Sequence, residues 1–421
     1  MKARTRLTTT ATNQEARPRA LHVTPASERG ALFLLYISID MSSKEEKIIA
    51  AINTTGFVFE NKVVELLRKN NWTVIGNKYY EDDLTQTVRE MDILAYKNSH
   101  IDGKNVLVVT TLLISCKKND KNSWIFFTRP SNPEDPNKDW KPLRFWTNEK
   151  RLKYSIENLK FGKNYLDGMV NGCSPIFSIP EKECFAFQEV EFGSDCAKCV
   201  TNNKKGASKN DSNIFNSITS LLKSQAYEMG SLDKRMKESR IYQFNLLSLS
   251  DIPGMYEVDF SDGQDLNVRE IDDVNYLSSY IIKRRESFNR IRFLSYESFE
   301  RAISQYDELH EYNCETLDNA LKEFYANLDT DKLQCLQQDF KERILNNFFF
   351  YVYGQNSIDI RKIFNEAWLY IDENQIKICI DADDSLLTEL RENQQLTQII
   401  ADALKKVYRY EGDFSIVDLP F

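Results

Sequence analysis

Histidine is scarce in this chain of 421 residues, which contains only three: His22, His100 and His310. HNH nucleases, phospholipase-D-type nucleases and most zinc hydrolases need two or more histidines brought together at one site. Three isolated histidines therefore make those classes of enzyme poor candidates.

Cysteines are also sparse, and long apolar runs are missing. The eight cysteines are spread along the chain, so no disulfide scaffold is indicated and a reducing compartment fits. No apolar run is long enough to span a bilayer, and the arginine-containing N-terminal stretch lacks the layout of a signal peptide. We expect a cytoplasmic protein that has no membrane partner.

An excess of positive charge is a third feature that the chain lacks, since its formal net charge is −8. A protein that coats nucleic acid through bulk electrostatics is usually basic. Any nucleic-acid binding must therefore use local basic patches around a defined site. Hydrophobic residues make up 42% of the chain, which is enough for a sizeable core.

Composition and periodicity predict three segments. Residues 1–43 are rich in Thr, Ala and Arg without periodicity, and we expect a flexible arm. Residues 44–310 mix helical and extended patterns and predict an α/β domain. Residues 311–421 predict an α+β accessory domain. The main elements expected are helices over 44–52, 57–69, 151–169, 214–229, 297–306, 315–327, 331–350 and 385–408, and strands over 72–75, 88–96, 106–117, 124–128, 184–192, 241–260, 292–295 and 368–380.

Glu60 lies on the apolar side of the predicted helix over 57–69. On a helical wheel it falls within the arc formed by Phe59, Val63, Val64, Leu66 and Leu67. A carboxylate on a core-facing stripe is costly unless it is paired or binds a metal. The alternative is a half-exposed glutamate at a helix start, where the helix dipole favours it.

Two further acids, Glu90 and Asp92, share one face of the predicted strand over 88–96, because side chains alternate along a strand. This strand leads into an apolar run, which favours a functional role for the pair. The alternative is an edge strand with polar outer positions.

A lysine stands at the end of a predicted apolar strand. Ser115 and Lys117 share a face at the end of the strand over 106–117, which we expect to be covered on both sides. A lysine at the end of a buried strand needs an anionic neighbour, which Asp92 and Glu60 supply if the two strands are adjacent. The alternative is a lysine that reaches solvent from the strand end.

The order of these motifs is Gly56-x-x-Phe59-Glu60 on a helix, Asp92 on a strand, and Ser115-x-Lys117 on the next strand. It resembles the PD-(D/E)xK restriction-endonuclease-like superfamily, especially the Mrr-like nucleases with their Gly-x-x-Phe-Glu helix. The resemblance implies a mixed central sheet flanked by helices. It also implies that Asp92 binds Mg²⁺, with Mn²⁺ as a substitute, and that Glu60 helps directly or through water. Lys117 would polarise the attacking water or steady the scissile phosphate.

One position departs from that pattern. The superfamily usually has Glu, Asp or Gln two residues before the lysine, where this chain has Ser115. Glu90 could replace the missing acid as a metal ligand. Alternatively, the site is catalytically inactive, and the protein binds nucleic acid or forms a complex on a degenerate nuclease fold.

The resemblance implies a metal-dependent nuclease that hydrolyses DNA, ahead of RNA, in bacterial restriction or anti-phage defence. A homodimer and a partner protein of a defence system are both open. Residues 371–392 contain seven acids and two bases, so this end should repel nucleic acid. Residues 311–421 would then serve in sensing, dimerisation or regulation.

Several weaker signals complete the analysis. Lys118, Lys223 and Gln225 are candidate substrate contacts, although an exposed helical face is the favoured interpretation of the last two. The stretch from Trp124 to Trp146 is the best candidate for a substrate-contacting loop. Cys116 suits a buried, inert thiol. A structural zinc site would need the cysteines Cys173, Cys184, Cys196 and Cys199.

Overall fold

A computed structural model describes residues 43–82, 86–169, 171–191, 208–209, 211–261, 266–282, 285–348 and 360–419. The chain divides into two units between Asn53 and Thr54. In the first unit, residues 43–53 are helical, as predicted from Lys44 onward. Residues 1–42 of the predicted arm lie outside the described residues.

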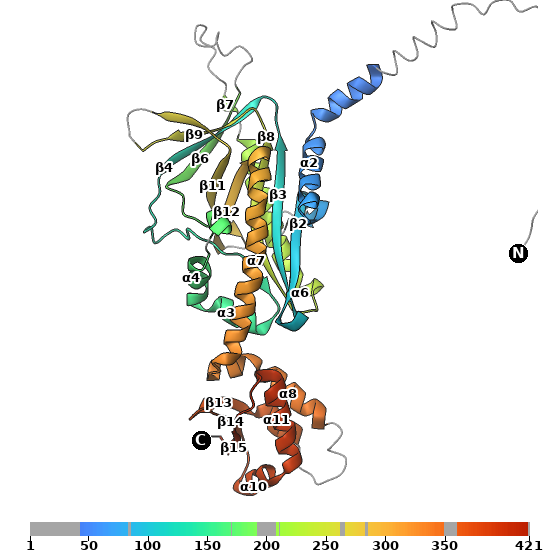
Figure 1. Cartoon of the computed structure of the whole chain (residues 1–421), viewed down its shortest axis with the longest axis vertical. Coiled ribbons are helices and arrows are strands. Elements are labelled where there is room, and N and C mark those ends of the chain that lie inside the picture. Colours follow the sequence, from blue (N-terminus) through green and yellow to red (C-terminus); the bar gives the residue numbers. More distant parts are fainter. Residues whose placement is uncertain are drawn as a thin grey trace, which may run out of the picture. The chain divides into compact units, whose positions relative to one another are not determined.

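The second unit is a mixed α/β structure built on a seven-stranded sheet (Figure 1). Its strand order is β1-β2-β3-β8-β12-β11, and the short β5 pairs with β8. The neighbours β3, β8 and β12 run parallel, whereas β1, β2, β5 and β11 pair antiparallel. The strands are β1 (Thr73–Glu81), β2 (Val88–Ile101), β3 (Val106–Lys118), β5 (Phe145–Thr147), β8 (Arg240–Asp251), β11 (Asp273–Ile282) and β12 (Arg285–Ser295).

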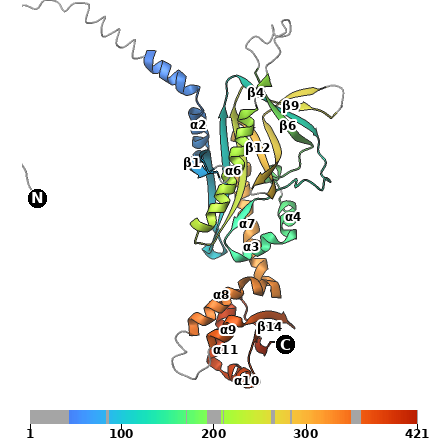
Figure 2. The same cartoon turned by 180° about the vertical axis from the view of Figure 1, so that it is seen from behind.

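Helices cover both faces of this central sheet. Helices α2 (Gly56–Lys69) and α7 (Tyr296–Ala326) pack on one face, and α6 (Ser212–Arg235) packs on the other. Helix α7 is in front in Figure 1, and α6 is in front when the molecule is seen from behind in Figure 2. The expected mixed central sheet flanked by helices is therefore confirmed, and the buried β3 is covered on both sides as predicted.

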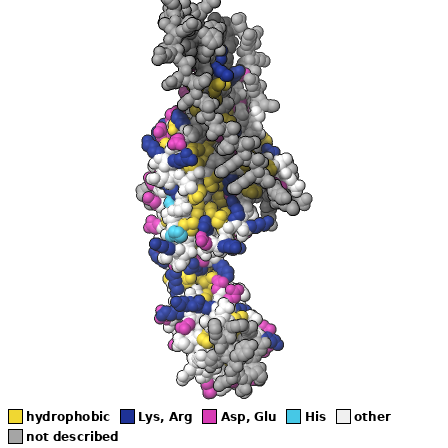
Figure 3. Space-filling model, turned by 90° about the vertical axis from the view of Figure 1, so that its right-hand side faces the viewer, with side chains coloured by type: hydrophobic (Ala, Val, Ile, Leu, Met, Phe, Trp, Pro, Cys, Tyr) yellow, Lys and Arg dark blue, Asp and Glu magenta, His cyan; other side chains and the backbone are white. Residues whose placement is uncertain are grey.

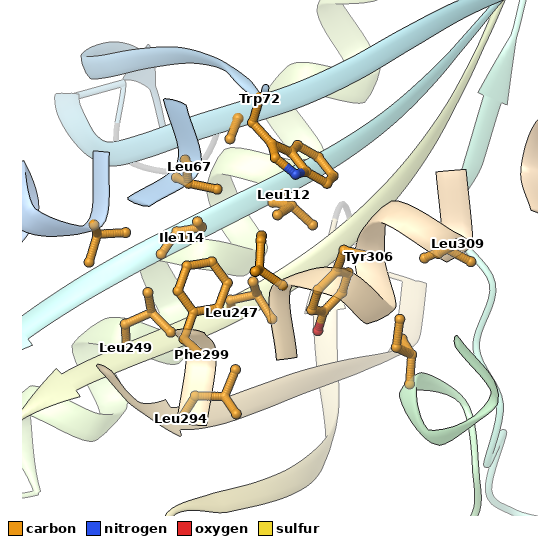
Figure 4. Close-up of a cluster of buried hydrophobic side chains, with 14 of the residues drawn as sticks. Leu67, Trp72, Leu112, Ile114, Leu247, Leu249, Leu294, Phe299, Tyr306 and Leu309 are labelled. Atoms are coloured by element: carbon orange, nitrogen blue, oxygen red, sulfur yellow. The ribbon is translucent and has the colours of Figure 1, made fainter. Parts of the chain in front are cut away.

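Alternation along the strands explains the two cores. Leu112 and Ile114 face α2 and α7, whereas Leu113 faces α6. The first core is shown in Figure 4, where side chains from the sheet meet those of the two helices. Its labelled members are Leu67 of α2, Trp72, Leu112 and Ile114 of β3, Leu247 and Leu249 of β8, Leu294 of β12, and Phe299, Tyr306 and Leu309 of α7.

A second, five-stranded sheet has the order β10-β9-β4-β6-β7. Trp124 and Phe126 from β4 pack edge-on and tilted against Phe293 of the central sheet, so both rings belong to the core. Trp124 is therefore not available as the substrate contact that we expected in this stretch. The strands are β4 (Asn122–Pro130), β6 (Lys182–Glu191), β7 (Ser208–Lys209), β9 (Met255–Asp259) and β10 (Asn267–Ile271).

Helix α7 corrects the predicted organisation of the C-terminal third. It runs without a break through residue 311, where we expected a domain boundary, and it joins the two helices predicted over 297–306 and 315–327. The buried stripe continues through the expected gap with Leu309, Asn313 and Leu317, at the spacing of a helix. The hydrophobic cluster of the C-terminal elements begins on the same helix, at Phe324.

Asparagine caps interrupt two other predicted helices. The helix expected over 151–169 is α3 (Lys150–Glu157) and α4 (Leu159–Asp167), because the side chain of Asn158 accepts the Lys160 N–H. The helix expected over 385–408 is α10 (Asp384–Glu392) and α11 (Gln394–Tyr408), capped in the same way by Asn393.

The C-terminal elements surround a three-stranded sheet of order β13-β14-β15. The strands β13 (Trp368–Asp372) and β14 (Gln375–Ile380) form the predicted pair, and β15 (Phe414–Asp418) was not predicted. The remaining elements are α8 (Thr330–Phe348), α9 (Ile360–Glu366), η1 (Asp102–Lys104) and η2 (Asn171–Ile176). Within the described ranges, no helix combines the length and apolarity needed to cross a membrane.

Hydrophobic side chains also reach the surface beside β1. Seen from the side on which α2 and β2 lie in Figure 1, they form a band with Lys and Arg along its margins (Figure 3). Ile75, Tyr79 and Val88 are exposed hydrophobic residues of β1 and β2. Beneath them, a groove of about 210 Å³ lies between α6 and the sheet and is lined by Leu94, Val109 and Leu232 among others.

Candidate active site

Asp92, Ser115 and Lys117 meet where β2 and β3 pair. The antiparallel register joins Ile93 to Ile114, which places residue 92 beside residue 115. The Lys117 Nζ lies 3.3 Å from Asp92 Oδ2, and the Ser115 hydroxyl donates to the same oxygen at 3.1 Å. The backbone N–H of Cys116 donates to it at 2.7 Å. Three donors therefore converge on one carboxylate oxygen.

Asp92 keeps its second oxygen available. No hydrogen bond from the described residues reaches Oδ1, because all three donors bind Oδ2. The side chains of Asp92 and Lys117 are 20% and 24% exposed, respectively, so the pair can be reached from solvent. This arrangement holds the carboxylate in one orientation and leaves one oxygen for a ligand.

Helix α2 brings Glu60 to the same place. Phe59, Val63 and Leu67 anchor the helix in the core, and this fixes the half-buried Glu60 beside the strand ends. A Cβ atom on Gly56 would lie only 3.3 Å from Glu60 Oε1, so the glycine leaves room for the carboxyl group. Among the described residues, Glu60 has no hydrogen-bond or ion-pair partner.

The pKa of Glu60 is raised by its burial and by its acidic neighbours. Burial is the largest cause that raises its pKa, and the negative charge of Asp92 raises it further. Lys117 lowers the pKa in part, and Glu90 raises it slightly. Two carboxyl groups therefore repel each other, and one lysine offsets only part of their negative charge. A proton or an added cation would relieve their repulsion.

Glu90 points to a different partner. It is exposed, and it accepts a hydrogen bond of 2.7 Å from the side chain of Asn77 on β1. Asn77 has a positive φ of 51°, a left-handed conformation that asparagine tolerates better than most residues. Asn77 was missed in the sequence, although Gly76-Asn77 inside a strand pattern is a signal of an irregular backbone. Whether Glu90 replaces the acid missing at Ser115 stays a prediction.

The residues present fit Mg²⁺ only if water and phosphate supply most of its ligands. No group of three or more His, Cys, Asp or Glu side chains able to hold a metal occurs in the described part of the chain. Mg²⁺, however, commonly binds through one or two carboxylates and keeps waters and phosphate oxygens for its other positions. Asp92 and Glu60 are the two carboxylates of this site that could hold such an ion.

Cys116 takes part through its backbone alone. Its side chain is 5% exposed and lies in the core below the site. Burial, followed by the charges of Asp92 and Glu60, raises the pKa of this thiol well above its ordinary value. A nucleophilic thiolate is therefore disfavoured, which agrees with the inert cysteine predicted from the sequence.

Two of the predicted substrate contacts are ion-paired in this structure, and the third is buried. Lys118 pairs with Asp251 at 2.8 Å and with Asp120 at 3.4 Å. Lys223 pairs with Asp82 at 2.6 Å. Gln225 is only 3% exposed, so the prediction of an exposed helical face is wrong for it, because this side of α6 packs on the sheet.

Asp82 is a buried, ion-paired acid that the sequence did not reveal. Its side chain is 1% exposed and holds both Arg89 and Lys223. It thereby ties β2, three residues before Asp92, to helix α6. An aspartate between a strand and a loop carries no local signal that it is buried, so only its distant partners identify it.

The four cysteines proposed for zinc are not brought together as far as they are described. Cys173 and Cys184 are free and belong to different hydrophobic clusters. Cys196 and Cys199 lie outside the described residues.

The chain was compared with protein-family models, curated proteins and solved structures, and it matches none of them. The fold and the site define a mixed α/β protein in which a lysine and two carboxyl groups converge at the ends of two central strands.

Proposed function

We propose that this protein is a metal-dependent phosphodiesterase that cleaves nucleic acid, with DNA as the first substrate to test. The observation that carries the proposal is the pairing of Lys117 with Asp92 at 3.3 Å next to the unpaired, half-buried Glu60. An ion pair that served only stability would need Asp92 and Lys117 alone. It would not need the unpaired carboxyl group of Glu60 close to Asp92.

The residues of the site have distinct tasks in this proposal. Asp92 and Glu60 would hold Mg²⁺, with Mn²⁺ as a substitute. The bound ion would supply a more acidic water and neutralise charge that develops on the phosphate. The ammonium group of Lys117, within reach of Asp92, would steady the phosphate or orient the water. Ser115 keeps Asp92 in place by donating to it.

The experiment is plasmid cleavage in Mg²⁺ and in Mn²⁺, with variants Asp92→Asn and Lys117→Met. Matched controls are Asp167→Asn and Lys160→Met, which change exposed residues of α4. We expect the two site variants to lose cleavage by a factor of about 100 or more, whereas the controls keep it. Cleavage that survives both site substitutions would refute the assignment.

A second function is a nucleic-acid-binding or complex-forming protein without catalysis. The specific observation in its favour is Ser115, which offers Asp92 a hydroxyl donor where a third acid would have been a further metal ligand. Fluorescence anisotropy with labelled DNA in EDTA, beside the cleavage assay, separates the two functions. Binding without cleavage in either metal would favour this second function.

The biological role and the partners of the protein can be proposed only on the basis of nuclease activity. Restriction or anti-phage defence, a homodimer, and a partner protein bound through residues 311–421 are extensions that depend on nuclease activity being found first.

A further inference from the structure

A cavity of about 280 Å³ is lined by the end of β4 and the chain after it, by the start of β6, and by the β11–β12 pair. None of the residues of the carboxylate–lysine site lines it. Three cations line the cavity, Arg129, Lys138 and Arg290, against a single carboxylate, Glu183. The cavity is therefore positively charged in a protein whose net charge is negative.

Arg290 contributes a charge that no ion pair with a described acid neutralises, and Asp139 acts on it only at longer range. Its guanidinium donates to the backbone carbonyls of Ile176 and Ser178, both at 2.8 Å, and of Trp140 at 2.6 Å. Among the described residues, no carboxylate forms an ion pair with it. Burial lowers the pKa of Arg290 to about 10, and at neutral pH the group is still charged. A buried cation of this kind is stabilised by an anion that enters the cavity.

Arg129 and Lys138 share Glu183, and Lys138 also lies 3.9 Å from Asp135, which does not line the cavity. Arg129 binds Glu183 at 2.6 Å, and Lys138 binds the other oxygen of the same carboxylate. The three cations of the lining thus pair with only two carboxylates, and a phosphate would find donors here that are already held in position.

Flat rings and an amide complete the lining. Lys138 lies over the ring of Trp140, 5.0 Å from its centroid, and Arg129 lies over Phe185 at 5.1 Å. Tyr276 and Phe288 also line the cavity. The Asn275 Oδ1 is buried and has no hydrogen-bond partner among the described residues, which is costly unless a ligand or water donates to it.

We propose that this cavity binds a single nucleotide, with its phosphate at Arg129, Lys138 and Arg290 and its base against the aromatic rings. A donor group of the nucleotide would satisfy Asn275. The volume lies near the lower limit of about 300 Å³ for small-molecule sites, which suits one nucleotide and no more. The proposal does not depend on nuclease activity at Asp92. A free nucleotide and the 5′-phosphorylated end of a single strand share this chemistry.

Isothermal titration of the full chain with AMP tests the proposal, with adenosine, inorganic phosphate and a 5′-phosphorylated oligonucleotide as further probes. The titrations contain EDTA so that any nuclease activity is silent. The variants are Lys138→Gln and Asn275→Asp, and Lys160→Gln, an exposed lysine of α4, is the matched control. Circular dichroism establishes that each variant is folded. Asn275→Asp keeps the shape of the side chain, so it tests the site without opening a hole.

We expect AMP to bind, inorganic phosphate to compete with it, and adenosine to bind at least tenfold more weakly, roughly the loss of one charge-assisted contact. Lys138→Gln and Asn275→Asp should each weaken AMP by about tenfold, and Lys160→Gln should leave binding unchanged. Tighter binding of AMP identifies a free nucleotide, and tighter binding of the oligonucleotide identifies a strand end. The proposal is overturned if neither probe binds at millimolar concentration, if adenosine equals AMP, or if both site variants bind as the unaltered chain does.

Discussion

Acidification should weaken the attachment of α7 to the central sheet through His310. This histidine of α7 is 7% exposed and packs against β2 and β3. Its Nε2 is 2.9 Å from the Ser99 hydroxyl, and its Nδ1 is 3.0 Å from the Thr110 hydroxyl. Burial, and then the charge of Lys97, lower its pKa to about 4, while Asp307 raises it in part.

The size of the effect follows from that pKa. The ordinary value for histidine is 6.5, against about 4 in the folded chain. Between these values the unfolded chain binds a proton that the folded chain does not, so stability is present above 6.5 and is lost as pH falls toward about 4. A shift of this size corresponds to about 3 kcal/mol of unfolding free energy. Cys314, the other titratable side chain that contacts the ring, does not titrate in this window because burial raises the pKa of its thiol.

The assay is urea denaturation of the unaltered chain and of His310→Gln between about pH 7 and pH 4. Glutamine can bond to both hydroxyls without titrating. As pH falls over this window, the variant should therefore lose about 3 kcal/mol less unfolding free energy than the unaltered chain. The matched control is His100→Gln, because His100 is exposed on the same strand as Ser99. Parallel pH profiles for His310→Gln and the unaltered chain would refute the reasoning.

Three further predictions concern the site and its support. Asp82→Asn should cost about 3 kcal/mol in urea denaturation, because it leaves Arg89 and Lys223 without their buried acid; an unchanged midpoint would show that the pairing is only a surface contact. Glu60→Gln should raise the unfolding free energy in EDTA, since the ionised carboxyl is disfavoured by burial and by its acidic neighbours, and it should abolish any rise in Tm on adding Mg²⁺. A variant that still responds to Mg²⁺ would exclude Glu60 as a ligand. Phe299→Ala should cost about 3–5 kcal/mol, because the ring is fully buried under the site; a loss below about 1 kcal/mol would mean that the core refills the space.

Features that depend on near neighbours in the chain could be predicted. The buried positions Phe59, Val63, Leu66 and Leu67 of α2 are those expected from a helical repeat, because the repeat of a helix is set by its backbone. The apolar run of β3 likewise indicated a strand covered on both faces. Most helices and the strands β1 to β4 were predictable for the same reason. The strands β5, β10, β11 and β15 were not predicted, and α3, α4 and α7 had different limits from those expected.

The candidate site was predictable only in part. Asp92 and Lys117 were paired on the assumption that their strands are neighbours, and the register of β2 with β3 supplies that contact. The hydroxyl of Ser115 looked like a gap in the motif, and its role as a donor to Asp92 is visible only in three dimensions.

Contacts between distant segments were decided by the tertiary structure alone. Lys223 looked like an exposed helical residue, yet it is bound to Asp82, 141 positions earlier. Arg290 gave no sign in the sequence that backbone carbonyls more than 100 positions away would hold it beside a cavity. The physical reason is that burial and pairing depend on which elements pack together. Residue types and their periodicity specify elements and faces, whereas the packing of β-sheets and α6 determines which charges are neutralised and which remain for a ligand.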